Sequence, residues 1–172
     1  MIKCMKFNLL VLLSVFLSSC AGYQLGGAKP PSLASVQRIS VSMLENGTLH
    51  PRAEAIATSA VTAAVVQNGT YRLSDLDHAD AVIEGEVTSI DYSALRGSRL
   101  DALAAEELTN TVKISWRLKD ARDPTKLLAS GSSMGQSTFF VDSNLQTARQ
   151  NALPDAFERA AQNLILRISS GY

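Results

Sequence analysis

The chain contains few of the residues that usually carry catalysis or metal binding. Its 172 residues include two cysteines, two histidines and one tryptophan. His50 precedes a proline and His78 stands in a polar stretch, so the two histidines do not form the clustered ligand set that zinc requires. Asp75, Asp77 and Asp80 lack the spacing of a calcium-binding EF-hand loop. The sequence therefore predicts no metal site and no cofactor.

Signatures of nucleophilic catalysis and nucleotide binding are equally scarce. We expect no Gly-x-Ser-x-Gly nucleophile elbow, and the sequence has no Ser-x-x-Lys motif. It also has no phosphate-binding loop and no dinucleotide fingerprint. These absences predict that the protein is not an enzyme.

An excess of basic residues, the usual mark of nucleic-acid binding, is missing too. The chain has 16 basic and 16 acidic residues. Removal of an N-terminal signal with Lys3 and Lys6 leaves 14 basic residues against 16 acidic ones. A slightly acidic chain has no general attraction for nucleic acid, so any anion site must be local.

The first twenty residues have the layout of a secretory signal. Lys3 and Lys6 precede the apolar run Leu9–Val15, which is too short to span a bilayer. Leu17-Ser18-Ser19-Cys20 follows and resembles a bacterial lipobox, which predicts a cleaved signal over residues 1–19 and acylation of Cys20. The alternative is an ordinary cleaved signal with an incidental cysteine.

Acylation at Cys20 would leave the mature chain without a thiol, because Cys4 leaves with the signal. Ala21 occupies the place of the Asp that resembles an inner-membrane retention signal in other lipoproteins. We therefore expect a lipid-anchored protein on the periplasmic face of the outer membrane.

The mature chain divides into a tether and one domain. Residues 20–35 are rich in glycine and proline, which break helices and strands, and they span roughly 20 Å as a coil. The remaining residues, 36–172, are enough for a single domain with its own core.

Hydrophobic periodicity predicts an α+β fold with the order β-α-β-β-β-β-α. We expect a four- to five-stranded, mostly antiparallel or mixed sheet with two helices packed on one face. A phase change at Thr88-Ser89 predicts a bulge, and Pro154 should kink or divide the last helix, which Asp142 or Ser143 can cap. The predicted strands cover residues 36–44, 70–73, 81–92, 110–119 and 127–141, and the helices cover 52–67 and a segment from about 142.

Within these elements, residues 93–108 form a long excursion with helical character near its end. The first helix presents an alanine-rich face of Ala53, Ile56, Ala60, Ala63 and Ala64. The predicted core comprises Ile39, Val41, Ile83, Val87, Val112, Ile114, Trp116, Leu118, Phe157, Leu164 and Ile168.

One group of charged residues suggests a binding site. Lys113, Arg117 and Lys119 alternate along one strand, and Arg38 lies on the polar face of the first strand. If the helices cover the opposite face, these side chains form an open cationic row suited to phosphates of a lipid head group. The alternative is a solvated sheet face whose lysines prevent aggregation.

Several stretches together resemble the LptE-like family of LPS-assembly lipoproteins. They are Cys20-Ala21-Gly22-Tyr23-Gln24-Leu25, Ile39-x-Val41, Asn46-x-Thr48-x-x-Pro51, Ala79-Asp80-Ala81, Ile90-Asp91-Tyr92 and the closing amphipathic helix. The resemblance covers most of the mature chain. It implies two helices on a four-stranded sheet, anchored in the inner leaflet of the outer membrane.

The resemblance also implies a function. Such proteins plug and help to fold the large β-barrel LPS translocon, and they contact LPS during its transfer to the cell surface. The alternative is a regulatory or structural lipoprotein of a peptidoglycan-synthesis or secretion complex. Activators that reach the cell wall usually carry long linkers, so the short tether favours a partner close to the membrane.

Overall fold

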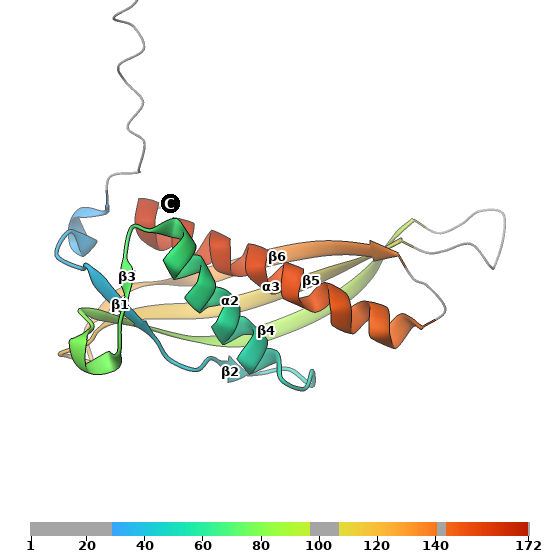
Figure 1. Ribbon diagram of the computed structural model, residues 1–172, viewed down its shortest axis with the longest axis horizontal. Coiled ribbons are helices and arrows are strands. Elements are labelled where there is room, and N and C mark those ends of the chain that lie inside the picture. The colour runs from blue at the N-terminus through green and yellow to red at the C-terminus, as the bar shows by residue number, and fades with distance from the viewer. Residues whose placement is uncertain (1–28, 97–106, 141–143, 172) are drawn as a thin grey trace, which may run out of the picture.

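One mixed sheet and two helices make up the fold (Figure 1). The computed structural model describes residues 29–96, 107–140 and 144–171. Both helices lie on the same face of the sheet, so the predicted α+β class and layer arrangement are confirmed. The strands are β1 (Arg38–Val41), β2 (Glu45–Asn46), β3 (Arg72–Leu73), β4 (Ala81–Arg96), β5 (Glu107–Asp120) and β6 (Leu127–Phe140). The helices are α2 (Ala53–Asn68) and α3 (Leu145–Ser170), with short 3-10 turns η2 (Pro31–Leu33) and η3 (Leu76–His78).

The sheet combines a parallel part with an antiparallel part. Its order is β3-β1-β4-β5-β6, with β2 also paired to β4. β1 runs parallel to β3 and β4, whereas β4, β5 and β6 form a long antiparallel meander. The parallel pairing arises because α2 carries the chain back to the end of the sheet at which β1 began.

The local predictions in the meander are largely correct. The register of β4 against β5 shifts between Val87 and Ser89, which confirms the predicted bulge. Two details differ. Glu45 and Asn46, which lie between the first predicted strand and the first predicted helix, form β2 along β4, and Glu107 and Leu108 are extended rather than helical. Residues 97–106 of the predicted excursion lie outside the described residues.

The predicted core is confirmed with one exception. Ten of the eleven predicted residues are buried, and Val41 is half-buried against them. Trp116 is the largest of the set, and its indole N–H donates to the Ser133 hydroxyl at 3.1 Å. Gly131 on β6 leaves room for this ring, since a Cβ there would lie 2.9 Å from Trp116 Cζ2.

Helix α2 buries only part of the predicted face, since Ala53 and Ala64 are buried while Ile56 and Ala60 are half-buried against the core. Its buried residues are Ala53, Ala57, Val61, Ala64 and Val65, whereas Ala63 is exposed. The prediction was incomplete because apolar residues surround this helix on every side, so periodicity alone marks no unique stripe. Packing against α3 as well as against the sheet selects the buried face.

Helix α3 is one continuous element of 26 residues. Pro154 lies within it but does not divide it, because its neighbours remain packed on the sheet. The cap is Asn144, whose side chain accepts a hydrogen bond from the N–H of Thr147 at 3.1 Å. The predicted caps Asp142 and Ser143 lie outside the described residues.

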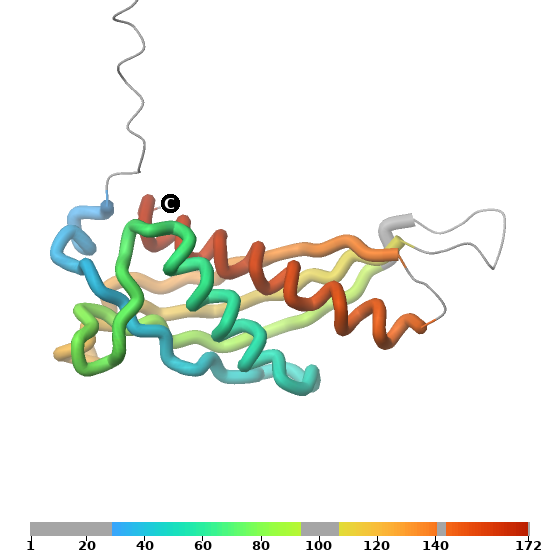
Figure 2. The backbone as a smooth tube through the Cα atoms, viewed as in Figure 1, coloured from blue at the N-terminus to red at the C-terminus, as the bar shows by residue number. Residues whose placement is uncertain are grey.

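The packed part of the chain begins upstream of Val36. Leu33 in η2, a residue assigned to the tether from the sequence, is 1% exposed and belongs to the core. Lys29 donates to the Val36 carbonyl at 2.9 Å and lies 4.6 Å from the centre of the Tyr71 ring. The start of the described chain and its C-terminal end therefore lie at the same end of the sheet, which we call the tether end (Figure 2).

Candidate functional site

The polar face of β5 forms the centre of the candidate site. Alternation along the strand turns Val112, Ile114 and Trp116 toward the helices, and it turns the residues between them outward. Lys113, Ser115 and Arg117 are exposed on this outer face, and Lys119 is half-exposed. The outer face is the one that neither helix covers. The helices therefore pack on the Trp116 face, as the candidate site requires.

Acidic residues of β4 lie beside this row. The register places Glu84 opposite Arg117 and Glu86 opposite Ser115. Lys119 Nζ lies 2.7 Å from Glu84 Oε2, a charge-assisted contact that partly neutralises Lys119. Lys119 is thus less available to an anion than the sequence suggested.

Arg38 is also engaged by an acidic partner. Its guanidinium lies 3.2 Å from Asp80 Oδ1, and Asp80 Oδ2 accepts the backbone N–H groups of Gln37 and Arg38. The N–H of Arg38 is the main reason why the pKa of the Asp80 carboxyl lies below its usual value, with help from the Arg38 guanidinium. This arrangement fastens the start of β1 to the start of β4, and it indicates a structural role for Arg38.

Lys113 and Arg117 remain the best candidates for an anion site. Neither belongs to an ion pair among the residues that the structure describes. Their Cα atoms are separated by about 13 Å, with the Ser115 hydroxyl between them. Lys113 faces Met134 and Arg117 faces Ser130 across the pair with β6, so uncharged side chains border the row on that side. An extended anionic head group with two phosphates fits this spacing.

The sequence analysis missed the acidic neighbours of the row. Glu84 and Glu86 alternate with Ile83 and Val87, so their outward direction was readable from the sequence. That β4 rather than another strand lies beside β5 depends on tertiary pairing. The only indication in the sequence that β4 pairs with β5 was that the two strands follow each other along the chain.

The letters of the Gly-x-Ser-x-Gly pattern do occur once in the sequence, although we expected no nucleophile elbow. Gly131-Ser132-Ser133-Met134-Gly135 has the letters of Gly-x-Ser-x-Gly. The pattern lies within β6 and not at a strand-to-helix turn, and Ser133 is buried under Trp116. This geometry differs from a nucleophile elbow, in which the serine stands exposed on a sharp turn.

The histidines do not come together. His50 Nε2 lies 3.1 Å from the Tyr92 hydroxyl, whereas His78 ends η3 at the tether end. Within the described residues, no group of three or more His, Cys, Asp or Glu side chains is placed to hold a metal ion.

A second polar cluster, which the sequence analysis did not identify, lies under the first turns of α3. The Arg149 guanidinium stands 4.7 Å from the centre of the Tyr92 ring, and burial raises the pKa of the Tyr92 hydroxyl. Asn110 is fully buried, and neither the nitrogen nor the oxygen of its amide has a hydrogen-bond partner among the described residues. Nothing in the spacing of β5 distinguished Asn110 from its apolar neighbours on the same face.

Comparison with known proteins identifies the family. A family model described as Lipopolysaccharide-assembly, LptE, matches residues 36–168, which is most of the chain. The protein belongs to the LptE family. The resemblance noted in the sequence is therefore confirmed, and LptE proteins are outer-membrane lipoproteins of lipopolysaccharide assembly. No curated protein matches the sequence.

Solved structures similar to this LptE protein share its fold at low identity. A minor lipoprotein from Acinetobacter baumannii is 14% identical, with a TM-score of 0.54 over 79% of this chain and 94% of that one. A protein from Xanthomonas campestris is 12% identical, with a TM-score of 0.52 over 86% of this chain and 94% of that one. A hypothetical protein from Chlamydia trachomatis is 8% identical, with a TM-score of 0.52 over 78% and 96%.

The described helices are not of the membrane-spanning kind. None of them combines the length and the apolar character that crossing a bilayer requires.

Proposed function

We propose that this LptE protein associates with the large β-barrel LPS translocon of the outer membrane, helps to assemble it and plugs it. The observation that carries the proposal is the family match over residues 36–168. The role is one of assembly and binding rather than catalysis. It requires a rigid domain held close to the membrane, and the packed meander and its two helices are consistent with this requirement.

The short anchor supports a partner within the same membrane. We propose that Cys20 carries the lipid, and eight residues separate Cys20 from Lys29. Such a segment reaches at most about 30 Å when fully extended. The short segment keeps the domain next to the membrane, which favours a partner in that membrane over the alternative role in peptidoglycan synthesis.

We further propose that the outer sheet face contacts LPS directly. Lys113 and Arg117 would donate charge-assisted hydrogen bonds to head-group phosphates, with the Ser115 hydroxyl between them. Lys119 and Arg38 contribute less to phosphate binding, because each already forms an ion pair, Lys119 with Glu84 and Arg38 with Asp80. Binding at an exposed row should weaken as salt rises.

Co-purification tests the proposed function. The full chain with a C-terminal affinity tag is expressed in a Gram-negative host together with the host strain's own β-barrel translocon subunit, and detergent extracts of the outer membrane are purified on the tag. We expect the barrel subunit in a defined ratio with the tagged chain. A tagged chain that elutes without the barrel, although it fractionates with the outer membrane, would contradict the proposal.

A further inference from the structure

Strand β6 is an unusually unprotected edge of the sheet. It ends the strand order, with β5 on one side and no strand on the other among the described residues. Its 14 residues, LLASGSSMGQSTFF, include no charged residue and no proline. Edge strands of this length normally carry charges or prolines that prevent pairing with another chain.

The backbone groups that point away from the sheet can be assigned from one contact. Asn163 of α3 donates its side-chain amide to the carbonyl oxygen of Met134 at 2.8 Å, from outside the β5–β6 ladder. Lys113 and Met134 are therefore a non-hydrogen-bonded pair, and the outward groups belong to every second residue of β6. They are Ser130, Ser132, Met134, Gln136, Thr138 and Phe140.

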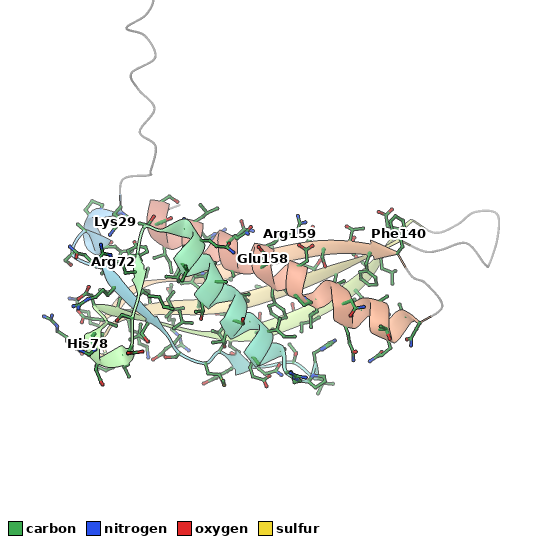
Figure 3. The ribbon with its side chains drawn as sticks, viewed as in Figure 1. Lys29, Arg72, His78, Phe140, Glu158 and Arg159 are labelled. Carbon is green, nitrogen blue, oxygen red and sulfur yellow. The ribbon has the colours of Figure 1, made fainter. Side chains whose placement is uncertain are left out.

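Among the hydrogen bonds of the described residues, the Met134 carbonyl is the one outward group of β6 that is engaged. Asn163 therefore closes the middle of the edge. The part beyond it, Gln136–Phe140, stays open at the end opposite to Lys29, as the position of Phe140 shows (Figure 3). We call Gln136–Phe140 the open edge.

The open edge runs along a hollow beside α3. A cavity of about 500 Å³ lies between Thr138 and Phe140 on β6 and Ala148 and Ala152 on α3. A second cavity of about 390 Å³ lies past Asn163, beside Met134 and Leu166.

Exposed apolar side chains stand among polar ones at these hollows, whose linings also include Asp155 and Arg167. Phe140, Met134 and Leu166 are 68%, 58% and 52% exposed. A strand placed on the open edge would bury apolar surface as well as pair its backbone.

We propose that the open edge binds an extended segment of the β-barrel partner, which joins the sheet as an additional strand. The inference rests on the proposed function and adds the surface and the mode of contact. Strand addition uses unpaired backbone groups for affinity and flanking hollows for alternate side chains. Because β6 carries no charge, the segment that it fits is uncharged at the positions that pair with β6.

A second copy of the chain fits the edge less well. A two-fold pair of β6 strands would cross near the middle of the strand, where Asn163 already occupies the Met134 carbonyl. Antiparallel pairing would also place the two tether ends at opposite ends of the joined sheet, since each β6 spans about 45 Å. Self-association is therefore an outcome for the test to exclude.

Proline substitution tests the inference without breaking the sheet. The N–H of Thr138 points outward, so Thr138→Pro removes no hydrogen bond to β5. Ser132→Pro is the matched control, because it makes the same change on β6 on the other side of Asn163. We expect Thr138→Pro to reduce co-purification of the barrel subunit with the tagged full chain about fivefold, the effect of losing the one hydrogen bond that the Thr138 N–H would donate. Ser132→Pro should leave co-purification unchanged.

Two further measurements keep the test decisive. Thr138→Lys places a charge on the open edge with no backbone change, and it should give the same loss if Thr138→Pro does not fold. A photoreactive benzophenone residue at position 136 should cross-link to the barrel subunit, and it should do so more strongly than the same residue at the control position Ser132.

The outcomes separate this inference from the proposed function. The strand-addition proposal would be overturned if both Thr138 variants co-purified with as much barrel subunit as the wild type does. Cross-links from position 136 to a second copy of the chain would overturn it as well. Either result would leave the proposed function standing. Absence of the barrel from the wild-type preparation would overturn both.

Discussion

Gly135 of β6 and Ala160 of α3 lie so close together that no side chain fits between them. A Cβ atom at position 135 would clash with the backbone nitrogen of Ala160 and with the carbonyl oxygen of Ala156, and it would lie 3.0 Å from Ala160 Cα. Glycine on the strand and alanines on the helix permit this approach. The contact sets the height of α3 above the sheet, and with it the hollow beside the open edge.

We expect Gly135→Ala to destabilise the domain by about 1–3 kcal/mol, because the clash involves backbone atoms that cannot rotate away. Urea denaturation followed by Trp116 fluorescence measures the change. Ser132→Ala, at an exposed position of the same strand, serves as the control and should stay within about 0.5 kcal/mol of the wild type. Equal free energies of unfolding for the two variants would contradict the prediction, because they would mean that α3 can move away from a Cβ at position 135 without loss of stability.

Asp80 should make the domain sensitive to acid. Its folded-state pKa lies below the usual value, so its contribution to stability is complete above the unfolded pKa of about 3.9 and is lost as pH falls through the lower folded value. Asp80→Asn should cost about 1–2 kcal/mol at pH 7 through weakened bonds to the N–H groups of Gln37 and Arg38. Thermal unfolding at pH 7 and at pH 3 should show a smaller difference between variant and wild type at pH 3. A constant difference would mean that the carboxylate charge is not involved.

The proposed LPS contact predicts a loss of binding without a loss of stability. Lys113→Ala combined with Arg117→Ala should weaken binding to LPS micelles about tenfold or more at low salt, because two exposed cations are removed. The melting temperature and the co-purified barrel should stay nearly unchanged. Glu84→Gln is an informative companion, since freeing Lys119 should strengthen binding. If the double variant bound LPS with the affinity of the wild type, the row would be only a solvated sheet face and not a binding site.

Lipidation at Cys20 predicts a simple fractionation result. Cys20→Ser should abolish labelling by a clickable fatty acid and should release the chain from the membrane fraction. Cys4→Ser should change neither result, because Cys4 lies in the segment that is expected to be removed. Continued labelling of the Cys20 variant would disprove the assignment.

The sequence predicted the fold well where one face of an element is buried and the other is wet. Strand β5 is the clearest case, because Val112, Ile114 and Trp116 alternate strictly with polar residues. The end of α2 can also be read from the sequence, because glycine favours the left-handed conformation after a helix, and Gly69 has a φ of 70°. The buried face of α2 could not be predicted fully, because apolar residues are distributed almost evenly around the helix.

Only part of the candidate site could be predicted from the sequence. Strand alternation alone placed Lys113 and Arg117 on one face, because that property depends on backbone geometry within a single strand. The engagement of Lys119 by Glu84 and of Arg38 by Asp80 required knowledge of neighbouring strands.

The sequence by itself therefore determined the elements, the directions of their side chains and the expected lipid anchor, because these depend on periodicity and short motifs. Only the tertiary structure decided that β6 lies at the edge of the sheet, that Asn163 closes its middle and that Gln136–Phe140 stays open. The physical reason is that strand order and helix height depend on long-range packing, such as the contact between Gly135 and Ala160, which no local pattern specifies.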